Sequence, residues 1–469
     1  MDEKIPLTIP KSVLRVAFAV VLASFTPMLY STMLNIALKD LMVSLQTTLA
    51  MVQWGVTGYT LALTVAVPIS GWLLDHFNAR RIAILATLLF GLFSLASGLA
   101  WDINSFISFR ILQGFTAGLS TTVGMSILMR VAPSQVLGRL MAIITIPMIF
   151  GPIIGPVIAG LLLQMASWRW IFFFGVILIL VTIPVIIRFI PDFTPFNPDN
   201  RLDLVGIGLL AIAAASLIFG LVQGANGTTF FNVRLIGFGG FGLILFLVYG
   251  WWDHNQQGHT VLPLRFFKSQ HFSAAMAGMF LSAIVMNGPL LVLPLFFENV
   301  RGFTPTQAAL ILIPQGAGML LARPIVGRII DTIGSRLVTM VSLMITLIGS
   351  LPFVFTTART NLIWLVLVLF IRGIGVSGIQ LPMMTDIFLE MGPQDIPAAS
   401  VGNQMIQNVG SSFGTAMMTA VIALETTTRS KISESVATLH GYQLAFLASC
   451  IVIGVMVLPA IFLSHRSRN

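Results

Sequence analysis

The sequence predicts an all-α integral membrane protein with 14 transmembrane helices. Of its 469 residues, 57% are hydrophobic and 9% are charged, whereas a soluble domain carries about 25% charged residues. The 25 lysines and arginines and the 16 acidic residues are too few to build a water-exposed surface for a chain of this length. The apolar runs are continuous instead of alternating in short pieces, which disfavours a transmembrane β-barrel.

Each predicted helix is an apolar run of about 20 residues, the length that crosses a bilayer core about 30 Å thick while satisfying its own backbone hydrogen bonds. In chain order, these runs cover residues 13–36, 50–74, 81–100, 104–129, 139–164, 168–190, 204–223, 233–252, 272–297, 306–330, 337–356, 361–385, 398–425 and 441–463.

The distribution of lysine and arginine predicts the orientation, since short cytoplasmic loops retain these residues. With the N-terminus inside, 15 of the 25 basic residues fall in inner segments and seven in outer segments. The other three, Arg110, Arg323 and Arg372, lie within predicted spans. Both termini are therefore expected to be cytoplasmic, and topology explains most of the net charge of +9. Residues 1–11 carry two acids and two prolines, unlike a signal peptide.

The sequence argues against several classes of function. No basic run is longer than a pair such as Arg80-Arg81, so no nucleic-acid partner is expected. The single cysteine is Cys450, and none of the six histidines stands in a metal-ligand spacing. The glycine-rich pieces 237–242 and 373–378 lack the Lys-Ser/Thr of a phosphate loop. We expect a lipid-embedded chain with no metal, no cofactor and no enzymatic activity.

Two segments that lie 256 residues apart are similar, residues 68–80 and 324–336. Each carries a glycine near a helix end, through which a neighbouring helix can approach, and an aspartate and an arginine that can form charge-assisted hydrogen bonds near the headgroups. One such turn alone would be an ordinary solvated helix end, but the duplication favours a role in conformational gating. The matched residues are Gly71, Asp75 and Arg80 in the first segment and Gly327, Asp331 and Arg336 in the second.

The repeat divides the chain into two six-helix blocks. We expect an N-terminal bundle at 1–190, a two-helix insertion with cytoplasmic loops at 191–271, and a C-terminal bundle at 272–469. The two inserted helices are expected to be peripheral.

The loop repeat and several helix motifs resemble the major facilitator superfamily, in particular its 14-span drug:proton antiporters. The resemblance covers essentially the whole chain. It implies two six-helix bundles that rock about a midplane site, and a multidrug efflux function in which small amphipathic compounds are exchanged for protons. It also implies a multi-pass protein of the bacterial cytoplasmic membrane, expected to be monomeric, that can work with an adaptor protein. The helix motifs are 29–38, Gln53-Trp54, Tyr59-Thr60, 110–114, 151–160, 168–172 and 399–403.

The fifth run carries glycines and prolines at i, i+4 spacing: Gly151 with Gly155, and Pro152 with Pro156. Small residues permit close backbone contact, and prolines bend the helix. An ordinary packing seam would explain the residues equally well. In the resembled family this motif marks exporters, from which Ala159 is the only departure here.

Arg110 lies in an apolar helix, where a buried guanidinium must pair with carbonyls or an acid. It can be a structural contact between helices, and the resemblance implies a part in proton transfer. Arg372 is its approximate counterpart in the second block. Arg323 directly precedes Pro324 and is expected to reach the cytoplasmic interface in a structural role.

Proton exchange needs a group that gains and loses a proton, and a desolvated carboxylate serves best. Where the resembled antiporters commonly have an aspartate in the first helix, this chain has Tyr30. The nearest candidates are Glu298 on the outer side, which we prefer, and Asp386 on the inner side; either can be an ordinary interfacial acid. With three arginines and no deep carboxylate, we expect neutral, amphipathic or anionic substrates over dicationic ones. An uncoupled facilitator, or a dedicated exporter of a lipid or metabolite, is the alternative on the same fold.

Polar residues in apolar helices are the candidates for the substrate cavity, which transporters commonly place at the midplane. Asn403, Gln407 and Ser411 recur every four residues and form one polar stripe, although hydrogen bonding between helices explains such a stripe equally well. The candidates are Asn35, Gln53, Tyr59, Gln113, Asn287, Gln315, Gln380, Asn403 and Gln407.

Overall fold

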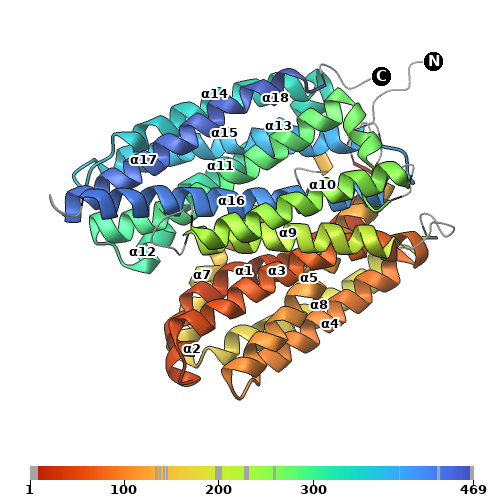
Figure 1. Cartoon of the computed structure of the whole chain (residues 1–469), viewed down its shortest axis with the longest axis horizontal. Coiled ribbons are helices and arrows are strands. Elements are labelled where there is room, and N and C mark those ends of the chain that lie inside the picture. Colours follow the sequence, from red (N-terminus) through yellow and green to blue (C-terminus); the bar gives the residue numbers. More distant parts are fainter. Residues whose placement is uncertain are drawn as a thin grey trace.

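The computed structural model describes residues 9–132, 136, 139–140, 143, 146–195, 203–225, 232–256, 260–389, 391–429 and 434–464. Within these ranges the chain forms helices and turns, and no strand. The helices run alongside one another in two groups, as Figure 1 shows. The predicted all-α class is confirmed for the described residues.

The N-terminal half contains one helix for each of the first six predicted spans and, in addition, a short unpredicted helix, α2. The helices are α1 (Lys11–Ile36), α2 (Leu38–Ser44), α3 (Leu49–His76), α4 (Ala79–Gly98), α5 (Ile103–Val131), α7 (Ile146–Met165) and α8 (Arg169–Phe189).

The remaining helices follow the other eight predicted spans, with breaks at three of them. A π-helical turn opens the eighth span, a two-residue turn divides the tenth, and a single residue divides the last. The elements are α9 (Leu204–Ala225), η2 (Leu235–Gly239), α10 (Gly240–Asn255), η3 (Leu264–Lys268), α11 (Gln270–Arg301), α12 (Pro305–Leu310), α13 (Ile313–Ile333), α14 (Ser335–Val354), α15 (Leu362–Leu389), α16 (Ile396–Arg429), α17 (Glu434–Val455) and α18 (Val457–Ile461).

Local sequence explains several helix ends. Asn78 accepts hydrogen bonds from the backbone of Arg80 and Arg81 and so starts α4. Asp102 and Ser105 form a reciprocal capping box at the start of α5, and hydrogen bonding from Ser105 lowers the pKa of the Asp102 carboxyl. Gly302 ends α11 at φ 69°, a left-handed conformation that favours glycine.

Eleven of the described helices are long and apolar enough to cross a membrane by length and composition. The other three predicted spans correspond to α7, α13 and α16, each at least 20 residues long. Three charged residues, among them Arg323, interrupt the apolar character of α13, and amides do the same in α16. The chain is therefore a multi-pass membrane protein, and the count of 14 spans stays a prediction.

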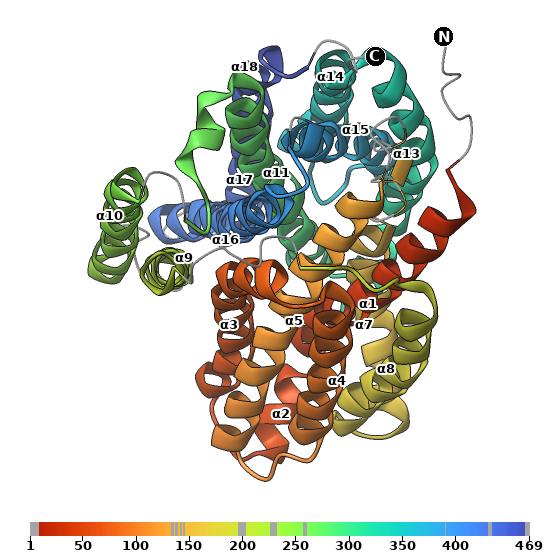
Figure 2. The ribbon, with the colours of Figure 1, turned by 90° about the vertical axis from the view of Figure 1, so that its right-hand side faces the viewer.

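The two halves lie one above the other in Figures 1 and 2, with α9 and α10 along one side of their junction. Helix α9 packs against both α3 and α16, so it contacts both halves, whereas α10 packs on α9 and its adjoining turns. Many apolar side chains of α10 are exposed, including Leu243, Leu247 and Trp251. The two-helix insertion at 191–271 and its peripheral position stay predictions.

Helix α1 begins and helix α18 ends at the same end of the molecule, which we call the terminal end; the opposite one is the distal end (Figure 1). The largest buried apolar cluster lies here and includes Val13 and Leu463. That both termini lie in the cytoplasm stays a prediction.

The terminal-end cluster joins the two halves, because it contains buried side chains from α1, α4 and α5 as well as from α11, α15 and α16. The two larger clusters toward the distal end are separate: the buried side chains of one come from the N-terminal half, from Leu29 to Ile179, and those of the other from the C-terminal half, from Val292 to Phe446. The halves also meet where α7 packs against α12 and α13. Within the described residues, the most extensive apolar contact between the halves is therefore at the terminal end.

Candidate functional site

The first loop repeat lies where the halves meet. A Cβ atom on Gly71 of α3 would lie 2.9 Å from Cγ2 of Val401 on α16, closer than real Cβ contacts allow. Gly71 is thus one position at which α3 closely approaches the opposite half. Gly327 in the second repeat is also buried.

The charged residues of the repeats hold loops at the terminal end. Arg80 donates to Asp192, which follows α8, at 3.1 Å and to the Ile187 carbonyl at 2.5 Å. Asp75 is buried. The backbone N–H of Arg336 donates to the Ser464 carbonyl at 3.0 Å, which ties the start of α14 to the C-terminal segment. The side chain of Asp331 lies outside the described residues.

The glycines of α7 pack against α1. A Cβ atom on Gly151 would lie 2.7 Å from Cγ of Met28, so this glycine lets the two helices approach closely. Gly155, one turn further along, is buried as well. The side chains of Pro152 and Pro156 lie outside the described part of the chain.

Arg110 is buried inside the N-terminal half at 1% exposure. Its NH1 donates to Gln113 Oε1 at 2.6 Å, its Nε donates to the Gly55 carbonyl at 3.3 Å, and its Cζ lies 4.1 Å from the ring centroid of Tyr59. Three of the predicted site residues, Arg110, Gln113 and Tyr59, therefore form one cluster. Within the described part of the chain, an aromatic face and two neutral acceptors balance the guanidinium, and no carboxylate forms an ion pair with it.

Arg372 is buried in the C-terminal half, at 2% exposure. It donates to Gln315 Oε1 at 2.8 Å, to the Val285 carbonyl at 2.9 Å and to Ser350 Oγ at 3.2 Å. The cluster joins four helices, α11, α13, α14 and α15. Gln315, a predicted cavity residue, is thus a ligand of this guanidinium.

The helix contacts show which residue of the N-terminal half corresponds to Arg372. Gly114 of α5 packs against the carbonyl of Tyr59, and Gly373 of α15 packs against the carbonyl of Gln315. Tyr59 and Gln315 are separated by the same 256 residues as the loop repeats, from 68 to 324. The residue before the contact glycine is Gln113 in one half and Arg372 in the other. Arg372 therefore occupies the place of Gln113, about one helical turn from that of Arg110.

Arg323 does not reach an interface, contrary to the expectation from sequence. Its side chain is 2% exposed, and its Nε and NH1 atoms have no hydrogen-bond partner within the described structure. It lies near the middle of α13, which packs against α7 and α15. A buried guanidinium without acceptors is costly, so this residue is a further candidate for a functional role.

The two candidate acids have different surroundings. Glu298 is half-buried near the distal end of α11. Asp386 is 2% exposed near the terminal end of α15 and accepts hydrogen bonds from the Ser335 hydroxyl, the Ser464 backbone at 2.8 Å and the Ser464 hydroxyl at 2.7 Å. Asp386 thus binds the C-terminal segment to the start of α14, a role that the sequence did not indicate.

The amides of α16 form two short chains that point to different neighbours. Gln407 donates to Asn403 Oδ1 at 3.1 Å and accepts from Gln380 of α15 at 3.2 Å. Asn408 accepts from Gln404 at 3.1 Å and donates to Thr64 of α3, in the opposite half, at 3.4 Å. The predicted stripe is therefore one of two, and the one that crosses between the halves was missed. Amides at positions 404 and 408 show the same four-residue spacing in the sequence.

Three other cavity candidates are less informative. Asn287 is half-buried and donates to the Ala283 carbonyl of its own helix at 3.0 Å. The side chains of Asn35 and Gln53 lie outside the described residues. Within the part of the chain that the structure describes, no group of three or more His, Cys, Asp and Glu residues suited to a metal is found.

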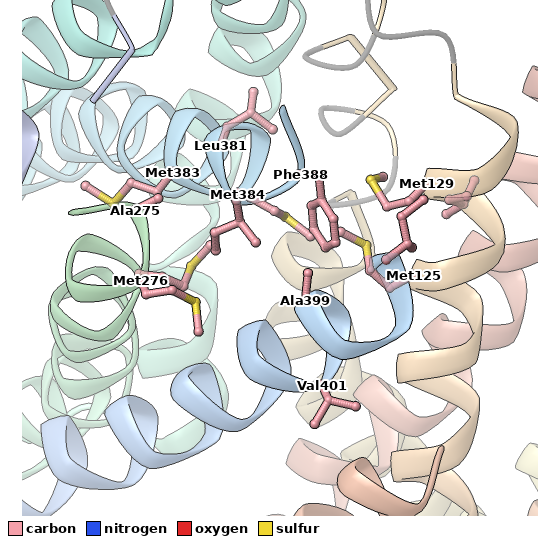
Figure 3. Packing of buried hydrophobic residues seen from close by; sticks show 14 of the residues in the cluster. Met125, Met129, Ala275, Met276, Leu381, Met383, Met384, Phe388, Ala399 and Val401 are labelled. Carbon is pink, nitrogen blue, oxygen red and sulfur yellow. The ribbon is translucent and has the colours of Figure 1, made fainter. Parts of the chain in front are cut away.

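Methionines form much of the contact between the halves at the terminal end. Figure 3 shows the ring of Phe388 between Met384 of α15 and the side chains of Met125 and Met129 of α5. Met276 of α11 lies on the other side of Met384 in this view. The sequence does not single out these residues, because an apolar side chain in a membrane helix gives no sign of whether it faces lipid or another helix. Thioether side chains are flexible and can repack against different neighbours.

Two bundles with repeated loops, a buried arginine cluster in each, and apolar contact at one end define a membrane transporter of the kind built from two internal repeats. The family model of the Major Facilitator Superfamily matches residues 20–415, and the chain belongs to that superfamily. It is a transporter of small molecules and not an enzyme.

Two bacterial relatives illustrate the similarity. The chain is 32% identical over 416 residues to the multidrug resistance protein B homolog of Mycobacterium tuberculosis H37Rv, covering 88% of this chain and 76% of the relative. It is 27% identical over 433 residues to the MFS-type transporter YhcA of Bacillus subtilis, covering 89% of this chain and 79% of the relative.

Solved structures show the same fold at low sequence identity. The human organic anion transporter MFSD10 superposes with a TM-score of 0.66 at 13% identity, covering 95% of this chain and 100% of that chain. The proton:xylose symporter XylE superposes with a TM-score of 0.64 at 13% identity, covering 95% and 96%.

Proposed function

We propose that the protein is a secondary active exporter of the multidrug efflux type, which exchanges small amphipathic compounds for protons by alternating access. The observation that carries the proposal is the apolar cluster that joins the two halves at the terminal end, while the distal clusters each belong to one half. A transporter closed at one end is a stage of an alternating-access cycle. The name of the Mycobacterium tuberculosis relative, a multidrug resistance protein B homolog, supports drug-like substrates.

The same proposal places the protein in the cytoplasmic membrane of a bacterium, with both termini in the cytoplasm. The bacterial relatives and the excess of basic residues in the inner segments support this placement. We propose a monomer that can act with an adaptor protein.

Proteoliposomes with an imposed pH gradient test the coupling. An antiporter accumulates a neutral amphipathic drug against its concentration gradient, and collapse of the pH gradient releases it. A facilitator only equilibrates the drug. Equal drug concentrations on both sides, despite a stable pH gradient and active protein, would contradict proton exchange.

Glu298 is the proposed coupling acid, and its half-buried position at the distal end of α11 gives it access to external protons. Glu298→Gln should abolish gradient-driven accumulation and leave downhill equilibration intact. Asp395→Asn is a matched control, because Asp395 pairs with the exposed Arg265 at 2.8 Å and should leave accumulation unchanged. Full accumulation by Glu298→Gln would exclude Glu298 as the coupling acid.

A facilitator is the second candidate, for a specific reason. Tyr30 stands where related antiporters commonly have an aspartate, and its hydroxyl lies 2.6 Å from Ser94 Oγ and 2.8 Å from the Phe172 carbonyl. The Tyr30 hydroxyl therefore forms structural hydrogen bonds within the N-terminal half. A dedicated exporter of a lipid or metabolite is compatible with the same observation, and equilibration of the drug without accumulation would favour the facilitator.

The charge distribution supports a substrate preference. Arg110, Arg323 and Arg372 are all buried, whereas the two candidate acids lie near helix ends. We propose that neutral, amphipathic or anionic compounds are exported in preference to dications. Efflux of a neutral drug and of a dicationic dye should be compared in the same cells. Strong efflux of the dication, unaffected by substitution of Glu298 or Asp386, would contradict this preference.

A further inference from the structure

A small space lies beside Arg372, inside the C-terminal half. It is large enough for one water-sized species. Its walls come from α11, α14, α15 and α17, so it lies within one bundle and not between the halves. The lining residues are Pro289, Leu293, Ser350, Phe353, Arg372, Phe446 and Ser449.

The polar groups around this space are donors. Arg372 contributes a guanidinium, whose acceptors among the described residues are all neutral. Ser350 Oγ already accepts from Arg372 Nε at 3.2 Å, which leaves its O–H free to donate. Ser449 is 2% exposed, and its Oγ has no hydrogen-bond partner within the described structure. The rest of the lining is apolar.

Neighbouring hydroxyls behave differently. Thr339 and Thr346 of α14 donate to the carbonyl four residues earlier, at 2.8 and 2.7 Å. This is the usual way for a buried helical hydroxyl to satisfy its hydrogen. In the part of the chain that the structure describes, neither Ser350 nor Ser449 forms such a bond. Two buried hydroxyls beside the guanidinium are therefore available to a ligand.

The N-terminal half shows why the charge of Arg372 needs such a ligand. Arg110 lies 4.1 Å from the centroid of the Tyr59 ring, whose electron-rich face stabilises the cation. Gln315 stands in the C-terminal half at the position that Tyr59 has in the N-terminal half. Arg372 therefore contacts an amide where Arg110 contacts an aromatic ring. The small space near Thr26, Thr87 and Thr182 in the N-terminal half has no charged residue in its lining. An uncompensated buried charge costs several kcal/mol, so an anion would be favoured in the space beside Arg372.

We propose that this space binds a small monovalent anion of the halide class, with chloride as the physiological ion. Arg372 neutralises its charge, and the hydroxyls of Ser350 and Ser449 donate to it. Because the site lies inside one bundle, the ion is a resident component that stabilises the C-terminal half and is not the transported substrate. The proposal is independent of proton exchange and of drug export.

Thermal unfolding of the purified full-length protein in detergent tests the site. Sodium chloride is replaced stepwise by sodium gluconate at constant ionic strength, since gluconate is too large for the space. Chloride should raise the midpoint of unfolding by about 2 °C or more and then saturate, and bromide should do the same. An unfolding midpoint that is the same in chloride, bromide and gluconate would show that water alone fills the space, and would overturn the proposal.

Two variants and one control assign the effect to the site. Arg372→Gln should abolish the chloride dependence. Ser449→Ala, a milder change, should raise the chloride concentration for half-saturation roughly tenfold. Ser97→Ala is the control, because Ser97 is equally buried but donates to the Phe93 carbonyl at 2.8 Å in the other half. A chloride response in Ser449→Ala identical to that of Ser97→Ala would overturn the proposal, even if Arg372→Gln does not fold.

Crystallographic anomalous scattering gives a direct observation. Crystals grown in sodium bromide should show a bromide peak within hydrogen-bonding distance of Arg372 and Ser449 Oγ. A water molecule in this place, without anomalous signal, would contradict anion binding.

Discussion

Individual buried charges in this protein are stabilised by different means. Arg110 has an aromatic face and a glutamine, Asp386 has two serines, and Arg323 has no partner for two of its nitrogen atoms within the described structure. In a low-dielectric interior each arrangement has a different free-energy cost. The effects of substitution should differ accordingly, even though the sequence shows only isolated charges in apolar helices.

Asp386→Asn should destabilise the terminal end of the C-terminal half by about 1 to 3 kcal/mol, because the amide places a donor against the donors of Ser335 and Ser464. Amide hydrogen exchange should increase in residues 456–464. Asp395→Asn serves again as the control. Unchanged exchange in this segment would show that Asp386 does not hold it.

Tyr59→Leu should lower the free energy of unfolding by about 1 to 2 kcal/mol more than Tyr59→Phe. The leucine removes the ring beneath Arg110, whereas phenylalanine keeps the ring and loses only the hydroxyl, 3.4 Å from the Pro27 carbonyl. Denaturant or thermal unfolding of the two variants provides the comparison. Equal stabilities would show that the cation–π contact contributes little.

Close approach of helix pairs organises each half. Gly114 and Gly118 of α5 face the carbonyls of Tyr59 and Leu63 on α3, and Gly373 of α15 faces the carbonyl of Gln315 on α13. Backbones can approach this closely only where no side chain intervenes. The same contact in both halves shows that the repeat extends from the loops into the packing of the helices.

Gly114→Ala should destabilise the protein by about 1 to 3 kcal/mol or prevent folding, because its Cβ would overlap the carbonyl of Tyr59. Gly160→Ala is the matched control: its Cβ would meet no atom of the described residues within 4 Å, and alanine favours the helix. Thermal unfolding and the yield of folded protein measure the difference. Equal behaviour of the two variants would contradict close packing of α3 and α5 at Gly114.

The molecule as a whole is two bundles held together by apolar contact at the terminal end, with α9 alongside their junction. In the alternating-access cycle that we propose, this contact separates. Thioethers make it adaptable, since Met125, Met129 and Met384 can repack against new neighbours (Figure 3).

A disulfide between Gly71→Cys and Val401→Cys should lock the terminal end, in a background in which Cys450 is alanine. A Cβ atom on Gly71 would lie 2.9 Å from Val401 Cγ2, which brings the two β-carbons within reach of a disulfide. Oxidation should abolish transport in proteoliposomes, and dithiothreitol should restore it. Each single-cysteine variant is the control. Full transport by the cross-linked protein would show that α3 and α16 do not separate here.

The sequence by itself determined the class of the protein, because the cost of exposing backbone polar groups to lipid forces long apolar runs into helices. It also determined most helix positions to within a few residues. The exceptions are the added helix α2, the two-residue break between α12 and α13, and α17, which begins at Glu434 where the predicted span begins at 441. The loop repeat and the buried arginines were equally visible, since charge is rare in apolar helices.

Only the tertiary structure decided which residues act together. The sequence made Arg372 the approximate counterpart of Arg110, and the contact of Gly373 with Gln315 shows that its position corresponds to Gln113, about one turn away. The tertiary structure also shows that Asp386 accepts hydrogen bonds from two serines and that Phe388 packs among methionines. The reason is physical: the periodicity of a membrane helix shows where polar groups lie along it, but its neighbours determine which of those groups are satisfied.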